Sequence, residues 1–277
     1  MKICVITGSR ADYGLLEWPI KLLKEDDFFE VKVEDIWGCD LAWAYYHIEH
    51  IKADMILVLG DRAEILGAVS GAHLRRIPIA HIGGGDVTEG SYDDAMRDAI
   101  SRMAAIHFVT STSAMARLTH LGYRNIHLVG SPGIDYIKHA DWKKERPYDK
   151  PYCVISYQPE TIDGTNEIEK VFKEIKSYPV FILPNRDRGD MEIRSAIQGY
   201  CNVNDGEWHN SFDHGAFLNL IHHCDEFIGN SSAMLYEAPE MGVKTKMIGK
   251  RQKGRVIPWG DGHASERIIK ILKYTHL

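Results

Sequence analysis

Short apolar runs alternate with longer amphipathic stretches along the whole chain, and this alternation limits the fold more than any other feature of the sequence. The apolar runs end near glycine or in polar loops. This pattern predicts parallel β-strands joined by helices. The clearest strands are expected at Ile3–Thr7, Met55–Leu59, Ile77–His81, Ile106–Thr110, Cys153–Tyr157, Val180–Leu183, Glu226–Ile228 and Lys246–Ile248.

The length of the chain favours two domains. Its 277 residues exceed the usual size of one domain, and a hydrophobic content of 44% is enough for two compact cores. A charged segment with two prolines, Asp141–Pro151, separates two strand–helix series and is interpreted as a linker. We therefore predict an α/β fold of two Rossmann-like domains, residues 1–142 and 150–277, facing across a cleft that holds the ligand. The last helical pattern, Ala264–Tyr274, is a candidate for packing back onto the first domain.

Charge and cysteine usage exclude several classes of protein. A formal net charge of -6 argues against a nucleic-acid partner, which needs a basic face. Five cysteines without a C-x-x-C pair suit reduced thiols, and the absence of Asp-x-Asp argues against a metal centre. No apolar run approaches the roughly 20 residues of a membrane span, and the N-terminus does not resemble a signal peptide. A cytoplasmic protein without metal, cofactor or membrane partner is expected.

The strongest local motif follows the apolar run at Glu226–Ile228. A polar turn, Gly229-Asn-Ser-Ser232, leads into a helical pattern, so backbone N–H groups near Ser231 and Ser232 would face a ligand such as a diphosphate. Glu237 follows five residues later, where a carboxylate could accept hydrogen bonds from ribose hydroxyls. The alternative is that the turn only caps the helix. The basic run Lys250–Arg255 emerges at the same sheet edge and favours an anion pocket.

Two loops of the first half carry charged candidates. Arg10 lies in the loop after the first strand, which lacks the G-x-G-x-x-G spacing of a dinucleotide site. It either reaches a phosphate or pairs with Asp12 at the surface. Asp61 follows the strand Met55–Leu59, where it is either an acid or base in the cleft or the cap of a helix beginning at Ala63.

The stretch from His81 to Arg97 is the richest in titratable groups. Three consecutive glycines allow close approach of the backbone to a ligand, and His81, Asp86, Asp93 and Asp94 bring titratable side chains to one place. A capping box of Ser91 with Asp94, and an ion pair of Asp93 with Arg97, are the structural alternatives. Because Asp94 already has the capping role, we favour Asp93 for chemistry.

These motifs, in this order, resemble the UDP-N-acetylglucosamine 2-epimerase family, and within it the hydrolysing branch that releases UDP and N-acetylmannosamine. The similarity covers nearly the whole chain. It runs through Thr7–Gly14, Gly60–Arg62, His81–Arg97, Tyr157–Thr161, Pro184–Asp187, Gly229–Ser232 with Glu237, and Gly249–Arg255.

The resemblance implies a glycosyltransferase-B-type fold and a UDP-sugar substrate, with UDP held mostly by the second domain. It implies that Asp61 and Asp93 are catalytic carboxylates, together with a family histidine, His81. Because the reaction needs more than one acid/base group, Asp86 is a further candidate in the same cluster. The residues that it implies for UDP or sugar binding are Arg10, Arg62, Gln158, Asn185, Ser231, Ser232, Glu237 and Arg251. Members of the family are often dimers or tetramers, so a homo-oligomer is a further expectation.

Three departures from the family pattern bear on activity. Gln158 stands where the family usually has histidine, and a glutamine cannot carry a proton at neutral pH. Gly83 occupies a position that often holds glutamate or histidine, and the chain is shorter between Asp40 and Ala53. Two alternatives therefore stand beside the epimerase: a glycosyltransferase or hydrolase using a related UDP-sugar, and a UDP-sugar binding protein without catalysis.

Overall fold

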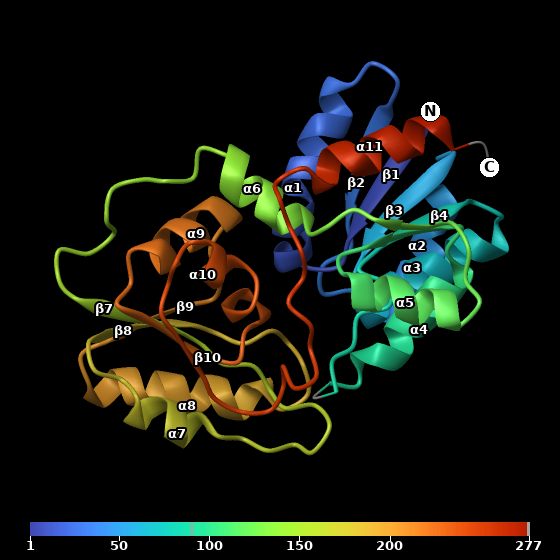
Figure 1. Cartoon of the computed structure of the whole chain (residues 1–277). Coiled ribbons are helices and arrows are strands. Elements are labelled where there is room, and N and C mark those ends of the chain that lie inside the picture. The colour runs from blue at the N-terminus through green and yellow to red at the C-terminus, as the bar shows by residue number, and fades with distance from the viewer. Residues whose placement is uncertain (90, 276–277) are drawn as a thin grey trace. The chain divides into compact units, whose positions relative to one another are not determined.

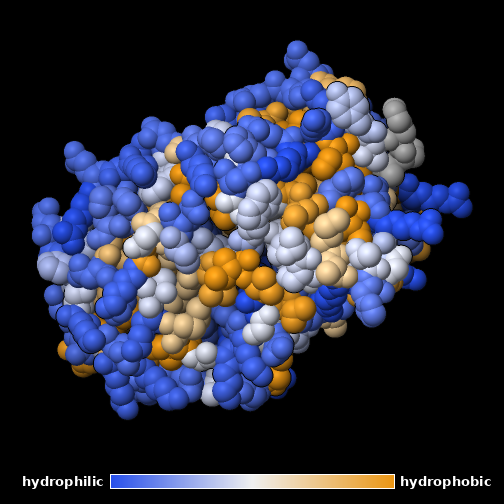
Figure 2. Space-filling view, in the orientation of Figure 1, coloured by the Kyte–Doolittle hydropathy of each residue, from blue (hydrophilic) through white to orange (hydrophobic). Residues whose placement is uncertain are grey.

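The computed structural model describes residues 1–89 and 91–275, and the chain divides into two compact units (Figure 1). Unit 1 consists of Met1–Val87, Asp93–Ala140 and Val256–Leu277, and unit 2 of Thr88–Tyr92 and Asp141–Arg255. The face shown in Figure 2 is mostly hydrophilic, as expected from a charged-residue content of 26%. None of the helices in the described parts has the length and hydropathy needed to cross a membrane.

Unit 1 is built on a six-stranded parallel sheet in the order β2-β1-β3-β4-β5-β6. Its strands are β1 (Lys2–Thr7), β2 (Glu30–Asp35), β3 (Met55–Leu59), β4 (Ile79–Ile82), β5 (Ile106–Val109) and β6 (Ile126–Leu128). The chain runs from β1 to the edge strand β2 and then crosses to β3 on the other side of β1. This reversal is a topological switch point, where α/β sheets place their ligands. Residues that follow β1 and β3 therefore lie at the expected site.

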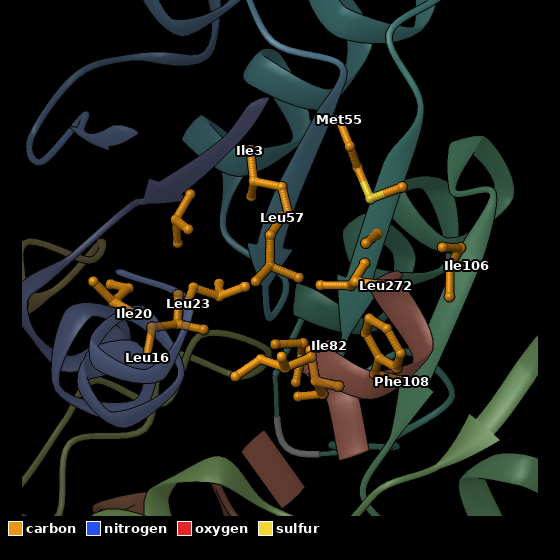
Figure 3. Packing of buried hydrophobic residues seen from close by; sticks show 14 of the residues in the cluster. Ile3, Leu16, Ile20, Leu23, Met55, Leu57, Ile82, Ile106, Phe108 and Leu272 are labelled. Carbon is orange, nitrogen blue, oxygen red and sulfur yellow. The ribbon is translucent and has the colours of Figure 1, made fainter. Parts of the chain in front are cut away.

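Helices cover both faces of this sheet because the buried strands β1, β3 and β4 are apolar on both sides. The helical elements are α1 (Arg10–Glu25), α2 (Leu41–His47), η1 (Ile48–His50), α3 (Ala63–Leu74), α4 (Asp93–Met103), α5 (Thr112–His120), α6 (Pro132–His139) and α11 (Ala264–Tyr274). Figure 3 shows the core on one face, where Leu16 and Ile20 of α1 and Leu272 of α11 meet Leu57 and Phe108 of the sheet. Residues of α2, α3 and α4 form the core on the other face.

The C-terminal helix α11 is anchored in unit 1 by a buried carboxylate. Asp135 of α6 is fully buried and accepts hydrogen bonds from the Ala264 N–H at 3.1 Å and from the Ser265 N–H and hydroxyl, both at 2.6 Å. A carboxylate at this position satisfies backbone donors that a helix start leaves unpaired. The helix also buries Ile268 and Leu272 completely, which stabilises unit 1 by roughly 1.5–3 kcal/mol per side chain.

The short connection between β2 and β3 folds as α2 and η1, and two glycines bring α2 close to α3. A Cβ on Gly67 would lie 2.2 Å from the Leu41 carbonyl oxygen, and one on Gly71 would lie 2.6 Å from that of Tyr45. No side chain larger than hydrogen fits at either place without moving a helix. The shortened segment is thus a tightly packed part of unit 1.

Unit 2 is built on a five-stranded parallel sheet in the order β11-β10-β7-β8-β9. Its strands are β7 (Tyr152–Ser156), β8 (Tyr178–Ile182), β9 (Glu207–His209), β10 (Glu226–Gly229) and β11 (Thr245–Met247), and its helical elements are α7 (Ile168–Lys173), α8 (Asp190–Val203), α9 (His214–His222), η2 (Ser232–Met234) and α10 (Glu237–Glu240). Figure 1 shows α7 and α8 on one face and α9 on the other. The strand order reverses between β7 and β10, so the second switch point lies there.

All eight strands predicted from apolar runs are present, and their ends agree within two residues. The strands that the prediction missed are β2, β6 and β9, and each lies at the edge of a sheet. An edge strand has one neighbour and more contact with water. Its side chains are accordingly part-buried or exposed, and it leaves no continuous apolar run in the sequence.

Candidate functional site

The first part of the candidate site lies at the switch point of unit 1, where β3 ends. Gly60 has a φ of +84°, a backbone conformation that residues with a Cβ atom disfavour. Its turn ends β3 and places Asp61 directly after the strand. The Asp61 side chain forms an ion pair with Arg97 of α4. The helix α3 that follows begins with Arg62 as its N-cap residue, so the alternative role of Asp61 as that cap is wrong.

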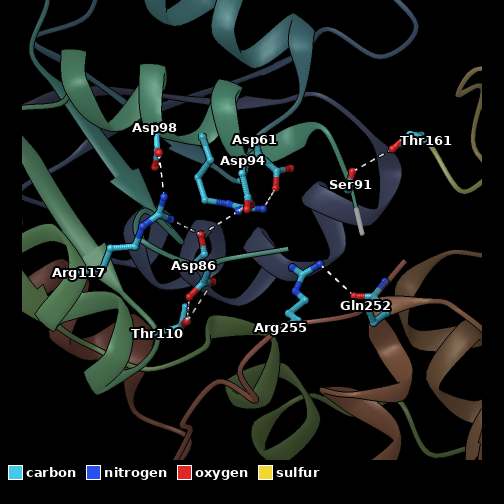
Figure 4. Close-up of polar contacts among 12 residues, drawn as sticks. Asp61, Asp86, Ser91, Asp94, Asp98, Thr110, Arg117, Thr161, Gln252 and Arg255 are labelled. Atoms are coloured by element: carbon cyan, nitrogen blue, oxygen red, sulfur yellow. Dashed lines mark hydrogen bonds and ion pairs between the residues drawn. The ribbon is translucent and has the colours of Figure 1, made fainter. Parts of the chain in front are cut away.

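Arg97 organises this region from a position that is almost fully buried, with 2% of its side chain exposed. It pairs with Asp61 and with Asp94, and its Nη1 also donates to the Asp86 carbonyl oxygen at 2.9 Å (Figure 4). Burying a guanidinium costs several kcal/mol unless charges and hydrogen bonds compensate, and here two carboxylates and a carbonyl do so. Arg97 thus fixes three acidic residues from separate segments in one cluster.

The side chains of Ser91 and Asp94 have contacts outside their predicted capping box. The Asp94 carboxylate lies on Arg97, and the Ser91 hydroxyl lies 3.3 Å from the Thr161 hydroxyl within unit 2. Asp93 is the first residue of α4 and is partly exposed, as a residue that contacts a substrate must be.

Asp86 is held by its backbone and its side chain. Its carbonyl oxygen accepts from Arg97 at 2.9 Å and from Arg117 Nη1 at 3.0 Å, while the Thr110 hydroxyl lies 3.2 and 3.3 Å from its two carboxylate oxygens. Gly83, three residues earlier, has a φ of +82°, and a Cβ there would lie 3.9 Å from the Asp86 carboxylate, which is an ordinary contact distance. Gly83 and Asp86 are therefore neighbours in the turn that follows β4.

His81 is completely buried, and both of its ring nitrogens are engaged by the protein. Its Nε2 lies 2.8 Å from the Gly60 carbonyl oxygen and its Nδ1 lies 3.1 Å from the Ser101 hydroxyl. A carbonyl only accepts, so Nε2 carries the proton. Burial lowers the pKa of His81 to about 4, so the ring is neutral. The ring supports the Gly60–Asp61 turn, and the role of His81 as a catalytic group stays a prediction.

Arg10 lies against an aromatic ring, and its predicted pairing with Asp12 does not occur. Its guanidinium lies 5.9 Å from the centre of the Trp37 ring. That ring is fixed by a relay in which Trp37 Nε1 donates to the Thr7 hydroxyl at 2.9 Å and Thr7 donates to Asp35 at 2.5 Å. Arg10 is exposed at the end of β1, where it remains available to an anion.

Asp12 and Arg62 lie near the same switch point. Arg62 donates from Nε to Glu64 at 2.5 Å, and Glu64 is buried. Asp12 Oδ2 is buried and has no hydrogen-bond partner among the described residues. Burial raises the pKa of Asp12 to about 7, against the opposing charge of Arg62. Near neutral pH this carboxyl can therefore hold a proton.

The second part of the candidate site lies at the switch point of unit 2, between the loops after β7 and β10. Asn230 is fully buried and pairs with the backbone of Gln158 through both amide atoms: its Oδ1 accepts from the Gln158 N–H at 2.6 Å and its Nδ2 donates to the Gln158 carbonyl at 2.9 Å. The Gln158 side chain accepts in turn from the N–H of Asn185, an exposed residue, at 2.8 Å. Three predicted segments thus meet at this edge.

Ser231 and Ser232 follow β10 as predicted, but a regular helix does not begin there. Ser231 caps the three-residue helix η2, where its hydroxyl accepts from the Ala233 N–H at 3.3 Å. The α-helix α10 begins only at Glu237 and ends at Glu240. Pro239 lacks a backbone N–H and disfavours a helical residue before it, which limits this segment to short turns.

The basic loop after β11 is held in place by acidic groups. Arg251 donates to the Pro159 carbonyl at 2.6 Å and pairs with Asp187 at 3.2 Å. Glu160, which is buried, accepts from the Lys250 N–H at 2.6 Å. Gly249 is required beside it, because a Cβ there would lie 2.1 Å from a Glu160 carboxylate oxygen. Arg251 thus lies beside the Gln158 loop.

Glu237 is the most unusual group of unit 2. It is 7% exposed, and its Oε2 has no hydrogen-bond partner among the described residues. Burial raises the pKa of Glu237 to about 7, although nearby Arg255 opposes the shift. Leaving such an oxygen unpaired costs roughly 1–3 kcal/mol, so its position indicates a ligand.

Sequence reasoning missed several residues that define the site. Its spacing from Asp93 predicts one partner for Arg97, whereas Arg97 joins residues from three segments. Glu160 lies inside the motif Tyr157–Thr161, but the motif alone predicts no role for it. The sequence predicts Asp12 only as a partner for Arg10. A buried side chain of this kind leaves one sign in the sequence, a charged residue within an apolar stretch, and that sign does not identify its contacts.

In the described parts of the chain, His, Cys, Asp and Glu side chains do not form a group of three or more that could hold a metal ion.

The chain is similar to known proteins over most of its length. The family model for UDP-N-acetylglucosamine 2-epimerase matches residues 41–257. A GDP/UDP-N,N'-diacetylbacillosamine 2-epimerase (hydrolyzing) of Campylobacter jejuni is 31% identical over 256 residues, which cover 85% of this chain and 66% of the relative. A UDP-N,N'-diacetylbacillosamine 2-epimerase (hydrolyzing) of Legionella pneumophila is 27% identical over 312 residues, covering 92% of this chain and 82% of that protein.

A solved structure shares the fold. UDP-GlcNAc 2-epimerase from Neisseria meningitidis, bound to UDP-GlcNAc, superposes with a TM-score of 0.76 at 16% identity, and the match covers 99% of this chain and all of the other. The two parallel sheets correspond to a glycosyltransferase-B-type fold, as predicted. Since the family model spans well over half of the residues, the chain belongs to the UDP-N-acetylglucosamine 2-epimerase family.

Proposed function

We propose that the protein is a hydrolysing UDP-N-acetylglucosamine 2-epimerase, which converts UDP-N-acetylglucosamine or a close relative into UDP and the free sugar inverted at C2. The observation that carries this proposal is the cluster of Asp61, Asp86 and Asp94 around Arg97, with Asp93 beside it at the start of α4. In a chain of this family, such a cluster supplies the acid/base groups that the reaction needs.

The reaction needs more than one acid/base group. A base removes the proton from C2 while the bond between C1 and UDP breaks, which gives a glycal and UDP. Water then adds to C1, and a proton returns to C2 from the opposite face. We assign these proton transfers to Asp61, Asp86 and Asp93. Asp61 is held by its ion pair with Arg97, and Asp93 is partly exposed at the start of α4.

Unit 2 is assigned to the nucleotide. Ser231, Ser232 and Arg251 lie at its switch point and would hold the diphosphate. Positive charge at this place stabilises the UDP that departs. Gln158 and Asn185 would contact the substrate, and the buried Glu237 would accept hydrogen bonds from the ribose.

The test is turnover in deuterated water with two substrates, UDP-N-acetylglucosamine and UDP-N,N'-diacetylbacillosamine, the second suggested by the names of the relatives. Release of UDP together with deuterium at C2 of the inverted sugar is expected. Release of UDP without C2 exchange would indicate a glycosyltransferase or simple hydrolysis. UDP binding without turnover would indicate a binding protein.

The catalytic role of Asp93 is tested by Asp93→Asn, which should abolish turnover and leave UDP affinity nearly unchanged. Asp98→Asn is the matched control on the same helix. Asp98 pairs with Arg117 at 2.8 Å and is 39% exposed, so its replacement should leave turnover nearly unchanged. An Asp93→Asn enzyme with a normal rate would remove Asp93 from the mechanism.

A further inference from the structure

The end of the basic loop returns to the segment that carries Glu237. The Arg255 guanidinium lies 4.9 Å from the centre of the Tyr236 ring, directly before Glu237 in the chain. Its Nη1 donates to the Gln252 side chain at 3.3 Å (Figure 4). Gln252 Nε2 in turn donates to the Asn230 carbonyl at 2.8 Å. Arg255 is therefore fixed against both ends of the segment that runs from Asn230 to Glu237.

Two buried polar atoms of opposite character lack partners at this place. Glu237 Oε2 is an acceptor and Arg255 Nε is a donor, and neither has a hydrogen-bond partner among the residues that the structure describes. The two side chains are close enough for the positive charge of Arg255 to lower the pKa of the Glu237 carboxyl, against the effect of burial. Orphaned polar atoms of this kind are uncommon in folded proteins. Two of them in one small region indicate a ligand group that both donates and accepts.

The chemistry of the two atoms limits what that group is. A phosphate offers only acceptors and would be repelled by the Glu237 carboxylate. A sugar hydroxyl can donate to a carboxylate and accept from a guanidinium N–H at the same time. Ion pairing of the guanidinium with an acidic ligand is therefore a poorer explanation than hydrogen bonding of a hydroxyl.

We propose that Arg255 is a second residue for ribose recognition: its Nε–H donates to a ribose hydroxyl of the nucleotide, and that hydroxyl donates to the Glu237 carboxylate. The proposal rests on the proposed function, which places UDP in unit 2. The Tyr236 ring holds the plane of the guanidinium, so Nε–H stays aimed without a further protein partner. Arg255 then determines selectivity for ribose, while Arg251 in the same loop acts on the diphosphate.

The experiment measures the affinity of UDP, 2'-deoxy-UDP and 3'-deoxy-UDP by titration calorimetry. The wild-type protein should prefer UDP over at least one deoxy analogue by tenfold or more, because the missing hydroxyl leaves both buried atoms unpaired. Arg255→Lys keeps the charge but loses the in-plane N–H and should reduce that preference to less than threefold. Arg255→Met should reduce the preference for UDP to the same extent. Because methionine is uncharged, this variant shows whether the lysine charge contributes to the result of Arg255→Lys.

Arg251→Lys is the matched control in the same loop. It should weaken UDP and both deoxy analogues by the same factor and leave the preference unchanged. Circular dichroism of each variant, compared with the wild type, identifies loss of fold. The proposal is overturned if Arg255→Lys and Arg255→Met are folded and keep the wild-type preference, or if the wild type binds UDP and both analogues equally. A wild-type protein that does not bind UDP would instead overturn the proposed function.

Discussion

Replacing Arg97 with methionine is expected to destabilise unit 1 by about 3 kcal/mol. Breaking a buried ion pair by removing one partner costs roughly 3–5 kcal/mol, because the other charge stays buried without compensation. Here the two carboxylates left behind, those of Asp61 and Asp94, keep 20% and 27% exposure, so water recovers part of the loss. The Asp86 carbonyl also loses one of its two donors. The lower end of the range is therefore expected.

Arg117→Met is the control, because Arg117 also donates to the Asp86 carbonyl and also pairs with an aspartate. Its side chain is 29% exposed and that of its partner Asp98 is 39% exposed, so solvent screens the pair. We expect a cost of about 1 kcal/mol or less. The contrast between the two arginines isolates the effect of burial from the effect of charge.

Amide hydrogen exchange followed by mass spectrometry measures both variants without assuming that the two units unfold together. A loss of about 3 kcal/mol should accelerate exchange in β3, β4 and α4 by roughly a hundredfold in Arg97→Met. Exchange within threefold of wild type would refute the reasoning. The double variant Arg97→Met with Asp61→Asn should recover stability, since it neutralises one orphaned charge. A double variant less stable than Arg97→Met would also refute the reasoning.

Three further outcomes are expected. Asp135→Ala leaves three donors at the start of α11 unpaired and should cost about 2–3 kcal/mol, seen as faster exchange of the α11 amides, whereas unchanged protection there would contradict this role. Gly67→Ala should lower the melting temperature through a cost of about 1–3 kcal/mol, because the added carbon would lie 2.2 Å from the Leu41 carbonyl; a rise in melting temperature would show that α2 yields easily. Burial raises the pKa of Glu237 from its ordinary 4.5 to about 7, so between those values the folded chain holds a proton that the unfolded chain has released, and stability falls as the pH rises through that window. The stability gain of Glu237→Gln over wild type should therefore grow between pH 5 and pH 8, on the order of 3 kcal/mol, and a melting-temperature difference independent of pH would disprove the assignment.

The interior of each sheet was predictable because buried parallel strands must be apolar on both faces. β3 and β10 were therefore visible as apolar runs, and the loops at their ends follow these strands as predicted. The edge strand β2, with the sequence Glu-Val-Lys-Val-Glu-Asp, faces water on one side and gave no such run. A short edge strand of this kind is recognised by its pairing with a neighbouring strand. It can therefore be predicted only after the position of that neighbour is known.

The contacts of the candidate site were less predictable than its location. In a helix, Asp93 and Asp94 lie four and three residues before Arg97, and both spacings allow an ion pair. The structure shows Asp94 on Arg97 together with Asp61, which is 36 residues away in the sequence. Asp135 is a similar case, since its partners lie 129 and 130 residues later. Short sequence patterns do not reveal contacts between residues that lie so far apart in the chain.

The return of the chain to unit 1 at its last helix has a consequence for the order of events during synthesis. Ile268, Ile269 and Leu272 belong to the same core as β1, which is synthesised before nearly all of unit 2. That core stays incomplete until the whole of unit 2 has been translated, so unit 2, whose residues lie mostly in one stretch, can reach its final packing first. The apolar face that α11 later covers is exposed in the nascent chain during that interval, which makes it a candidate binding site for chaperones.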